Sequence, residues 1–369
     1  MIRFLRIIII LEVLFIRNND FVSGNYIRYK INSKSDVLEK KMTSPEVIEN
    51  DDSMVSKTKS TVLSSKEIAH RKATIEWNYW GPNGERNWER MFNTCRGKSQ
   101  SPVNIEIERV VYLEDMQLTL INYDHPLKNI EMSNNGHTVK VRPIGEGRRA
   151  FVTGSAVNNR LYRFIEGHFH WRNAHKAGSE HAIDGEKYSL ELHLVHQNVR
   201  YEYEQDLNRI ISSPDAFLVM AVFYNETLSS KPNPVLHGLV KYFEKIFSNQ
   251  TSTIINDTIL LDRFIPDSTR FYRYQGSYTT PACNEIVTWI VFPTILDIAP
   301  QQMQKFHELI RKRFGSNNDE KIGFFRHIQE LGTRRIYAPD KMKSDGLLTI
   351  YFNNQNILFI LIFVFFILN

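Results

Sequence analysis

The chain has 369 residues, of which 42% are hydrophobic and 24% are charged. This composition excludes wholesale disorder and suits one globular domain of about 250 residues with additional segments, or two small domains. The net charge is only +5 and the basic residues form no concentrated block, so nucleic acid is not expected as a partner. Aromatic residues reach 12%, which favours strands over Ala- and Leu-rich helices.

Residues 1–24 have the features of a secretory signal peptide. Two arginines within residues 1–6 precede an apolar run at 7–16, and small residues allow cleavage after Gly24, although Glu12 interrupts the run. The alternative is an N-terminal membrane helix, but so short a run rises only about 15 Å against a bilayer core of about 30 Å. Residues 25–70 are rich in Ser, Lys, Asp and Glu and predict a disordered polar stalk.

Residues 71–340 are expected to form one domain, mainly β with surface helices, because their composition is steady and contains no repeat or linker. Alternating patterns predict strands at residues 138–142, 164–171, 190–196, 217–223 and 286–292. Helical periodicity appears late, where Met303, Phe306, Ile310 and Phe314 recur every three or four residues and Gly315 is suited to end the helix.

The C-terminal residues indicate a membrane anchor. Residues 357–368 are continuously apolar but too few to span a bilayer, which requires about 20. A spacer at 347–356 and the small triplet at 344–346 precede them, which is the pattern of a glycosylphosphatidylinositol (GPI) attachment signal. We therefore expect GPI attachment at Ser344 with removal of residues 345–369, while the apolar spacer leaves a tilted membrane anchor as the alternative.

Two further features concern the secretory pathway. N-glycosylation sequons begin at Asn225, Asn249 and Asn256, which supports a location on the extracellular face of the cell membrane. The two cysteines, Cys95 and Cys283, have no CxxC-type neighbour, which excludes Cys₄ zinc and iron–sulfur sites. They are either two buried thiols or one long-range disulfide, and the secretory features favour the disulfide.

Two groups of histidines predict a metal site. His168 and His170 alternate along a predicted strand, so both imidazoles project from one face. Taken alone, such a pair is often just the polar edge of a strand. In the second group, ELHLVH at 191–196, the same alternation places Glu191 and His193 on one face and His196 on the other.

His168, His170 and His193 are thus the candidate ligands, and Glu191 is placed to hold the second ring nitrogen of His193. Three imidazoles without a cysteine favour zinc with an open fourth position for water. The alternative is a cupin-like non-haem iron site, which also uses an HxH motif, a glutamate and a later histidine. Its glutamate would lie only a few residues after the HxH, whereas Glu180 lies ten residues after His170.

Several motifs, in order along residues 74–335, resemble those of the α-class carbonic anhydrases, in particular the secreted or GPI-anchored members. The resemblance covers essentially the whole predicted domain. The motifs are WNY at 77–79, QSP at 100–102, NNGH at 134–137, GHFHW at 167–171, GSEH at 178–181, ELHLVH at 191–196, YTTP at 278–281 and VTW at 287–289.

The resemblance implies a central, largely antiparallel ten-stranded sheet and reversible hydration of carbon dioxide to bicarbonate and a proton. It implies Zn²⁺ as the cofactor, held by His168, His170 and His193. Glu166 and Glu191 match residues that orient the ligand histidines, although the family often has Gln at the first of these positions.

The resemblance also assigns the remaining site residues. Thr279 matches the threonine that orients the attacking hydroxide and passes its own proton to a buried glutamate, here Glu180, while His137 matches the proton shuttle. Cys95 and Cys283 fall where secreted members place a disulfide. The substrate contacts would be Thr280, Val195, Val219, Val287 and Trp289, and the shuttle's water chain would be held by Tyr79 and Asn135. By themselves the valines and the tryptophan would indicate only a packed core.

Three positions depart from the family pattern. Lys140 replaces an amide and is expected to lower the pKa of His137 by like-charge repulsion. Tyr278 replaces a smaller apolar residue and is expected to narrow the substrate entrance. Ala282 stands where many members have a second proline after a cis bond, so either this bond is cis before alanine or the loop differs.

Two classes of function fit the resemblance. One is an active zinc enzyme; the other is a carbonic-anhydrase-like surface binding module with little catalysis, as in members that have lost zinc ligands. The three histidines, Glu180 and Thr279 are all present, which favours the enzyme.

Overall fold

The computed structural model describes residues 76–145, 147–173, 177–204, 206–228, 231–314 and 322–343. All of them belong to the unit that begins at His70. The predicted signal peptide, the stalk, the GPI signal and its attachment residue Ser344 lie outside the described residues.

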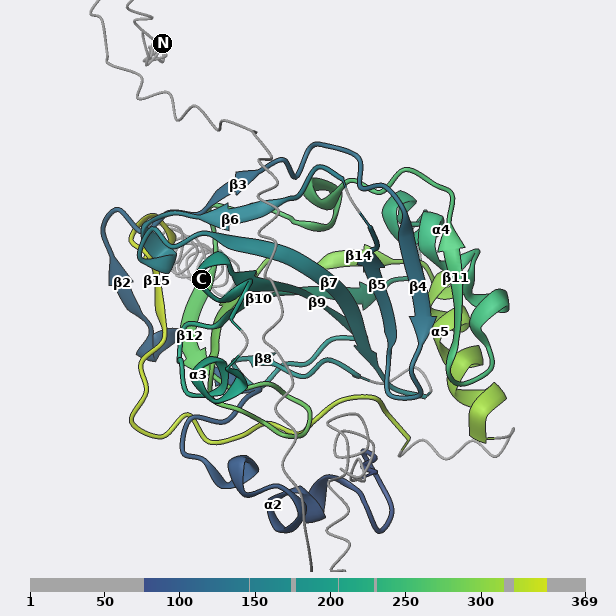
Figure 1. The fold of residues 1–369 in the computed structure, drawn as a ribbon, viewed down its shortest axis with the longest axis horizontal. Coiled ribbons are helices and arrows are strands. Elements are labelled where there is room, and N and C mark those ends of the chain that lie inside the picture. The colour runs from purple at the N-terminus through teal and green to yellow at the C-terminus, as the bar shows by residue number, and fades with distance from the viewer. Residues whose placement is uncertain are drawn as a thin grey trace, which may run out of the picture. The chain divides into compact units, whose positions relative to one another are not determined.

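One large mixed sheet forms the centre of the described domain (Figure 1). Along its continuous path, seven of the nine neighbouring pairs within the described residues are antiparallel, and β10–β13 and β15–β2 are parallel. The expected largely antiparallel sheet is therefore confirmed, as a mixed sheet with ten strands on its continuous path and thirteen in all among the described residues. The order is β11 (Thr251–Ile255), β4 (Ile130–Asn134), β5 (Val139–Pro143), β7 (Tyr162–Trp171), β9 (Leu190–Asn198), β10 (Phe217–Glu226), β13 (Val287–Val291), β12 (Tyr272–Gly276), β15 (Tyr337–Pro339) and β2 (Val111–Leu113).

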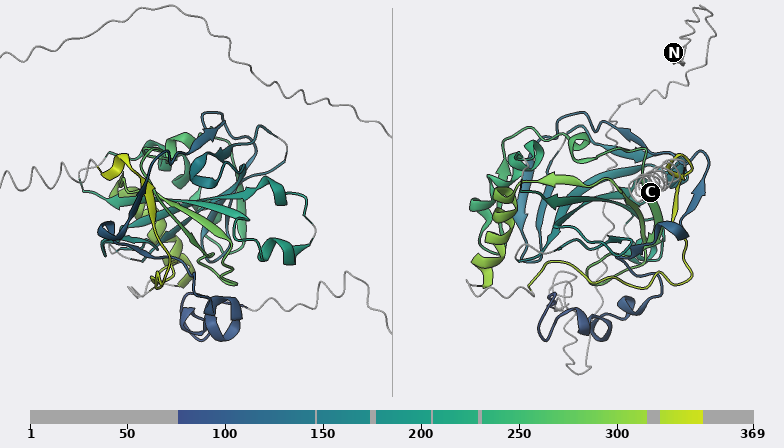
Figure 2. Two further views of the ribbon diagram at one scale, coloured as in Figure 1. Left: turned by 90° about the vertical axis from the view of Figure 1, so that its left-hand side faces the viewer. Right: turned by 180° about the vertical axis from the view of Figure 1, so that it is seen from behind.

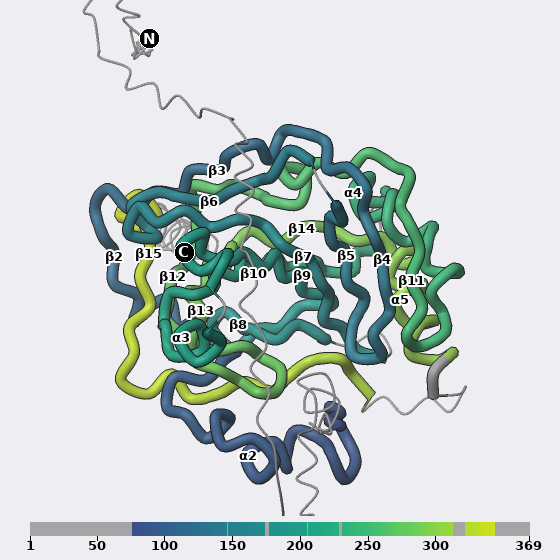
Figure 3. Tube along the Cα trace, viewed as in Figure 1, coloured from purple at the N-terminus to yellow at the C-terminus, as the bar shows by residue number. Residues whose placement is uncertain are grey.

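Shorter strands extend this sheet at its margins. β14 (Leu296–Ile298) pairs with β10, while β3 (Thr119–Ile121) pairs with β6 (Phe151–Thr153), which joins β7. A separate parallel pair consists of β1 (Asn104–Ile105) and β8 (Ala182–Ile183). The five strands predicted from alternation correspond to β5, β7, β9, β10 and β13, and β7, β9 and β10 lie next to one another in the middle of the sheet (Figure 3).

The helices lie at the periphery. α4 (Pro234–Val240) and α5 (Pro300–Phe314) lie side by side near β4 and β11, as the front and rear views both show (Figures 1 and 2). α5 confirms the predicted helix, and its Met303, Phe306 and Ile310 are fully buried. The other α-helices within the described ranges are the short α2 (Trp88–Met91) and α3 (Leu207–Ile211). Among the described residues, no helix is both long enough and apolar enough to cross a membrane.

The two faces of the sheet bury different cores. On β9, Leu192 and Leu194 pack into the larger core, which also contains Phe306 of α5. Val195 points to the opposite face and packs into a second core together with Val219 of β10. Successive residues of a strand alternate between faces, so this second face is the one that also carries His193, as the sequence pattern predicted.

Candidate metal centre and its surroundings

Three histidines meet on adjacent strands of the second face. His168 of β7 pairs directly with His193 of β9, and His170 lies two residues further along β7. One nitrogen of each ring can be chosen so that all three lie within 4.8 Å of one another. This arrangement follows from strand register, because the side chains of i and i+2 share a face and a paired residue lies opposite them.

The second nitrogen of two of these rings is held by a hydrogen bond. Nδ1 of His170 donates to the Phe324 carbonyl oxygen at 2.8 Å. Nε2 of His193 lies 2.7 Å from Oε1 of Glu191, which confirms the contact expected from the sequence. Nε2 of His170 and Nδ1 of His193 are thereby left for a metal, and the first of these is buried without a hydrogen-bond partner.

The third ring completes the donor set. Nε2 of His168 lies 3.3 Å from Nδ1 of His193, and its Nδ1 lies 3.2 Å from Oε1 of Glu166. Burial lowers the pKa of His170 well below its usual value and that of His193 to about 4, so both are neutral at pH 7. Neutral imidazoles whose nitrogens converge on one point are what a zinc site requires, so these residues fit that metal.

A buried hydrogen-bond network fixes Glu191. Its Oε1 also accepts from Nδ1 of His181 at 2.6 Å, and its Oε2 accepts from the backbone N–H groups of Glu180 and His181 at 2.7 and 2.9 Å. Although burial opposes ionisation, His181 and His193 hold the pKa of Glu191 well below its usual value. Nε2 of His181 in turn lies 2.7 Å from the Tyr274 hydroxyl.

His181, Glu191 and His193 also lie close enough to hold a metal as a second group. Their facing atoms already share hydrogen bonds, so we interpret them as support for the first group. The sequence analysis did not identify His181 and Tyr274 as site residues. The only signal for His181 was its place in the GSEH motif, because its partner Tyr274 lies 93 residues away.

Glu180 and Thr279 lie together beside the histidines, with the Glu180 carboxylate 3.3 Å from Nδ1 of His170 and 3.9 Å from Nδ1 of His193. Glu180 is fully buried, and its Oε1 accepts from the backbone N–H of Arg326 at 2.8 Å. Burial, followed by the charge of Glu191, raises its pKa well above the usual value, while hydrogen bonds from Arg326 and from the Thr279 side chain oppose this shift. A divalent cation at the histidines would favour the ionised carboxylate.

An apolar row adjoins the histidines. Across the strands, Val195 of β9 pairs with Val219 of β10, which pairs with Trp289 of β13, and all three are almost fully buried. Val287 belongs to the same core. The Trp289 ring lies 4.8 Å from the His193 ring, measured between centroids. The four apolar residues assigned by resemblance are therefore brought together beside a candidate ligand.

His137 lies on the turn between β4 and β5. Its ring stacks on Trp77 at a centroid distance of 3.9 Å and lies edge-on to Tyr79 at 6.4 Å. Tyr79 is buried and its hydroxyl has no hydrogen-bond partner. Asn135 is exposed, and its Oδ1 accepts from the backbone N–H groups of His137 and Thr138, both at 2.9 Å. Asn135 therefore shapes the turn that presents His137.

Lys140 has a partner that the sequence did not indicate. Its Nζ lies 2.9 and 3.1 Å from the two carboxylate oxygens of Glu166, while its expected effect on the pKa of His137 stays a prediction. The ion pair balances the charge of Lys140.

Tyr278 is half-buried against Phe217, and burial, followed by the charge of Glu166, raises its pKa well above the usual value.

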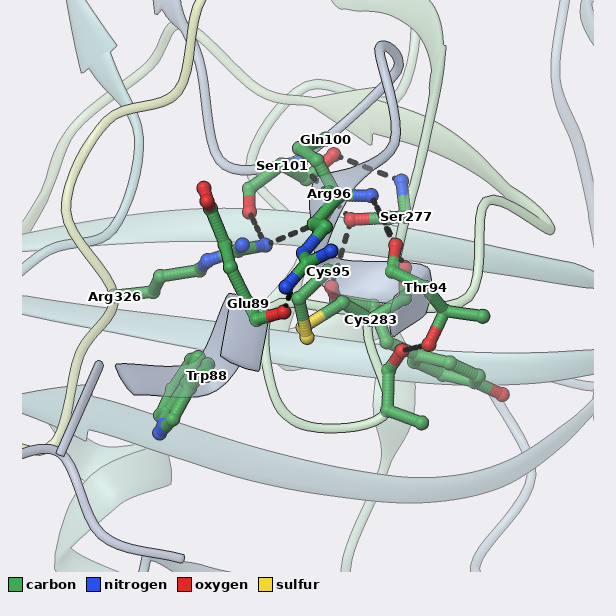
Figure 4. The surroundings of a disulfide bond; sticks show 12 residues. Trp88, Glu89, Thr94, Cys95, Arg96, Gln100, Ser101, Ser277, Cys283 and Arg326 are labelled. Carbon is green, nitrogen blue, oxygen red and sulfur yellow. Dashed lines mark hydrogen bonds between the residues drawn. A yellow bond between two sulfur atoms is a disulfide. The ribbon is translucent and has the colours of Figure 1, made fainter. Parts of the chain in front are cut away.

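The Cys95–Cys283 disulfide joins the segment before β1 to the loop that carries Thr279, which confirms the predicted bridge (Figure 4). The same loop is held by Gln100, whose Nε2 donates to the carbonyl oxygens of Thr94 and Cys283 at 3.1 and 3.2 Å. The Thr94 hydroxyl donates to the Ala282 carbonyl. Thr280 is half-buried in this loop, and the peptide bond before Ala282 is cis.

The fold and the donor set thus define a β-sheet protein with a three-histidine metal site. The chain belongs to the eukaryotic-type carbonic anhydrase family, whose model matches residues 83–340. This family is zinc-dependent, in agreement with the histidine group.

Individual relatives agree with the family match. Carbonic anhydrase 7 of Homo sapiens is 33% identical over 268 residues, covering 71% of this chain and 96% of that protein. Carbonic anhydrase 1 of Monodelphis domestica is 30% identical over 274 residues, covering 73% and 100%. The putative carbonic anhydrase 3 of Caenorhabditis elegans is 30% identical over 268 residues, covering 71% and 97%.

Proposed function

We propose that this protein catalyses the reversible hydration of carbon dioxide to bicarbonate and a proton, with zinc held by His168, His170 and His193. The observation that carries the proposal is the set of three converging ring nitrogens beside the Thr279–Glu180 pair. Zinc, when bound, supplies the Lewis acidity that makes water a nucleophile at neutral pH.

The protein's own residues orient the reactants. Glu180 accepts the hydroxyl proton of Thr279, so the lone pairs of Thr279 are directed at the attacking water and fix its orientation. The row of Val195, Val219 and Trp289, with Val287, offers carbon dioxide an apolar surface next to His193. Thr280, on the same loop as Thr279, contacts the bicarbonate product.

His137 exports the proton. A ring on a turn, stacked on Trp77 and close to Tyr79, is placed to exchange protons with solvent. Imidazole suits this task because its ordinary pKa lies close to neutral pH. Because Asn135 orders the turn, it and Tyr79 serve the proton path by positioning His137 and its waters.

The decisive experiment is a stopped-flow hydration assay on the full-length protein made in a eukaryotic secretory host, with its zinc content measured. We expect about one zinc per chain and a hydration rate that disappears on chelation and returns with added zinc. A folded protein that retains zinc without hydrating carbon dioxide would instead support the surface binding module.

We further propose that the enzyme acts at the extracellular face of the cell membrane, with residues 1–24 removed and a GPI lipid on Ser344. The Cys95–Cys283 disulfide supports an oxidising compartment. The sequon residues Asn225, Asn249 and Asn256 are all exposed, as glycosylation requires. Phosphatidylinositol-specific phospholipase C should release activity from intact cells. Recovery of an unmodified peptide spanning residues 357–368 from the membrane-bound enzyme would favour the tilted membrane anchor.

A further inference from the structure

Lys140, Glu166 and His168 lie together on the metal-binding face of two adjacent strands. Lys140 of β5 is the direct cross-strand partner of His168 of β7. Glu166 lies two residues before His168, and the Lys140 ammonium contacts both of its carboxylate oxygens, at 2.9 and 3.1 Å. Oε1 of Glu166 lies 3.2 Å from Nδ1 of His168. A cation, a carboxylate and an imidazole therefore form a continuous chain that ends at a candidate ligand.

The charges of this chain are partly shielded from water. The Lys140 and Glu166 side chains are 33% and 20% exposed, so their attraction is screened less than that of a fully exposed pair. The ammonium lies against both carboxylate oxygens of Glu166, and Oε1 of the same carboxylate faces Nδ1 of His168 at 3.2 Å. A carboxylate oxygen facing this nitrogen favours the tautomer that carries its proton on Nδ1.

The three candidate ligands differ in how their outer nitrogens are held. His170 donates to the backbone carbonyl of Phe324, a residue whose own N–H donates to the Trp171 carbonyl at 2.8 Å. The partner of His193 is Glu191, which is fully buried and anchored by the network described above. Glu166 is instead a partly exposed side chain, and at 3.2 Å it is not aligned for a hydrogen bond with Nδ1 of His168. Its position depends on what holds its carboxylate.

We propose that Lys140 is a positioning residue of the metal centre: it anchors the Glu166 carboxylate beside Nδ1 of His168 and so keeps the proton on Nδ1 and Nε2 free for the metal. The inference rests on the proposed zinc site but not on carbon dioxide turnover. It assigns to Lys140 a role at His168 besides the effect on His137 that the sequence had indicated.

The experiment compares Lys140→Met with a matched control on the same strand. Arg142 lies two residues along β5 on the same face and pairs with Glu131 at 2.7 Å across strands β5 and β4. Two quantities are measured on the full chain: the rate of zinc release to a chelator, and the His168 tautomer in zinc-free protein. The tautomer is read from ¹⁵N imidazole shifts, and the signal is assigned by its loss in His168→Gln.

We expect Lys140→Met to release zinc roughly 10-fold faster, at the lower end of the effect of removing partners of metal ligands. It should also shift His168 toward the Nε2-protonated tautomer. Lys140→Arg should leave zinc release and the His168 tautomer as they are in the unaltered protein, because a guanidinium can hold the same carboxylate. Arg142→Met should also change neither quantity. In a Glu166→Gln background, Lys140→Met should have little further effect.

Unchanged zinc release and an unchanged tautomer in Lys140→Met would overturn the proposal. So would an equal change in the Glu166→Gln background, because Lys140 would then act through its charge alone. The failure of the proposed function gives a different result, in which the unaltered protein binds zinc without hydrating carbon dioxide. If the unaltered protein binds no zinc, the tautomer in zinc-free protein still decides whether Lys140 positions His168 through Glu166.

Discussion

His193 and His196 lie three residues apart on β9 and face opposite sides of the sheet. Both are almost fully buried, and burial lowers both pKa values, to about 4 and about 3. The two residues differ in the partners of their ring nitrogens. His196 donates from Nδ1 to the Leu218 carbonyl at 3.3 Å and accepts at Nε2 from the Tyr123 hydroxyl, whereas His193 has one nitrogen on Glu191 and the other facing His168.

Burial and a shifted pKa therefore do not distinguish a ligand from a structural histidine. Both shifts follow from desolvation, which any buried imidazole experiences. The distinguishing property is a ring nitrogen that faces other histidine nitrogens instead of a carbonyl or hydroxyl group, and on β9 only the face of His193 provides it among the described residues. The predictions below test this contrast, beginning with the largest expected effect.

The largest effect is loss of the metal. His193→Ala, like His168→Ala or His170→Ala, should eliminate stoichiometric zinc and hydration, because two imidazoles do not form a tight open site. His196→Ala should keep its zinc. Metal analysis of the folded, gel-filtered protein checks the pair, and the reverse pattern would show that the assignment of the two faces is wrong.

A smaller loss of activity is expected when Glu180, beside the histidines, is changed. Glu180→Gln should lower hydration about 100-fold while zinc is retained, because the attacking water loses its fixed orientation but no ligand is removed. The measurement is the hydration rate per bound zinc. Glu114→Gln, at an exposed position, is the control. Full activity in Glu180→Gln would remove Glu180 from the mechanism.

Removal of the proton shuttle should have a weaker effect on turnover. His137→Ala should slow turnover roughly 10-fold in dilute buffer, where no external base replaces the missing imidazole. The interconversion of carbon dioxide and bicarbonate at chemical equilibrium, followed by isotope exchange, should be little changed. Added imidazole should restore much of the turnover. If it does not, protons leave by another route.

The smallest effect on turnover is expected at His196, on the opposite face of the sheet from His193. His196→Gln should leave turnover within about twofold but alter stability in acid. The unfolded pKa of about 6.5 exceeds the folded value of about 3, so the unfolded chain takes up a proton first and stability falls as pH decreases between them. This loss is on the order of 5 kcal/mol and should be missing in His196→Gln. Acid unfolding followed by circular dichroism tests it, with the exposed His237→Gln as control. Identical acid curves would contradict it.

The sequence predicted those parts of the site that depend on alternation within one strand. The common face of His168 and His170, and the separation of His193 from His196, follow from the two-residue period of a strand. The same logic placed Glu191 beside His193. The helix at Pro300–Phe314 was likewise visible in its own periodicity.

Contacts between strands could not be predicted in this way. Lys140 was linked to His137 because the resemblance places an amide near the proton shuttle at this position, yet its ion pair with Glu166 depends on the register of β5 against β7. In the pairing of β7 with β9 the register shifts between Phe164 and Glu166, so simple alternation along β7 does not show which face Glu166 occupies. The Phe324 carbonyl that holds His170 lies 154 residues further along the chain.

The disulfide also makes the middle of the chain a covalent ring. Its two cysteines are 188 residues apart, and the ring encloses all three candidate ligands as well as Glu180 and Thr279. Backbone cleavage within the ring, for example after the exposed Arg209 in α3, would yield two fragments that stay linked. Nicked enzyme would therefore run as a single band on a non-reducing gel and separate only after reduction. Whether the enzyme's backbone is intact must therefore be judged from reduced and non-reduced samples together.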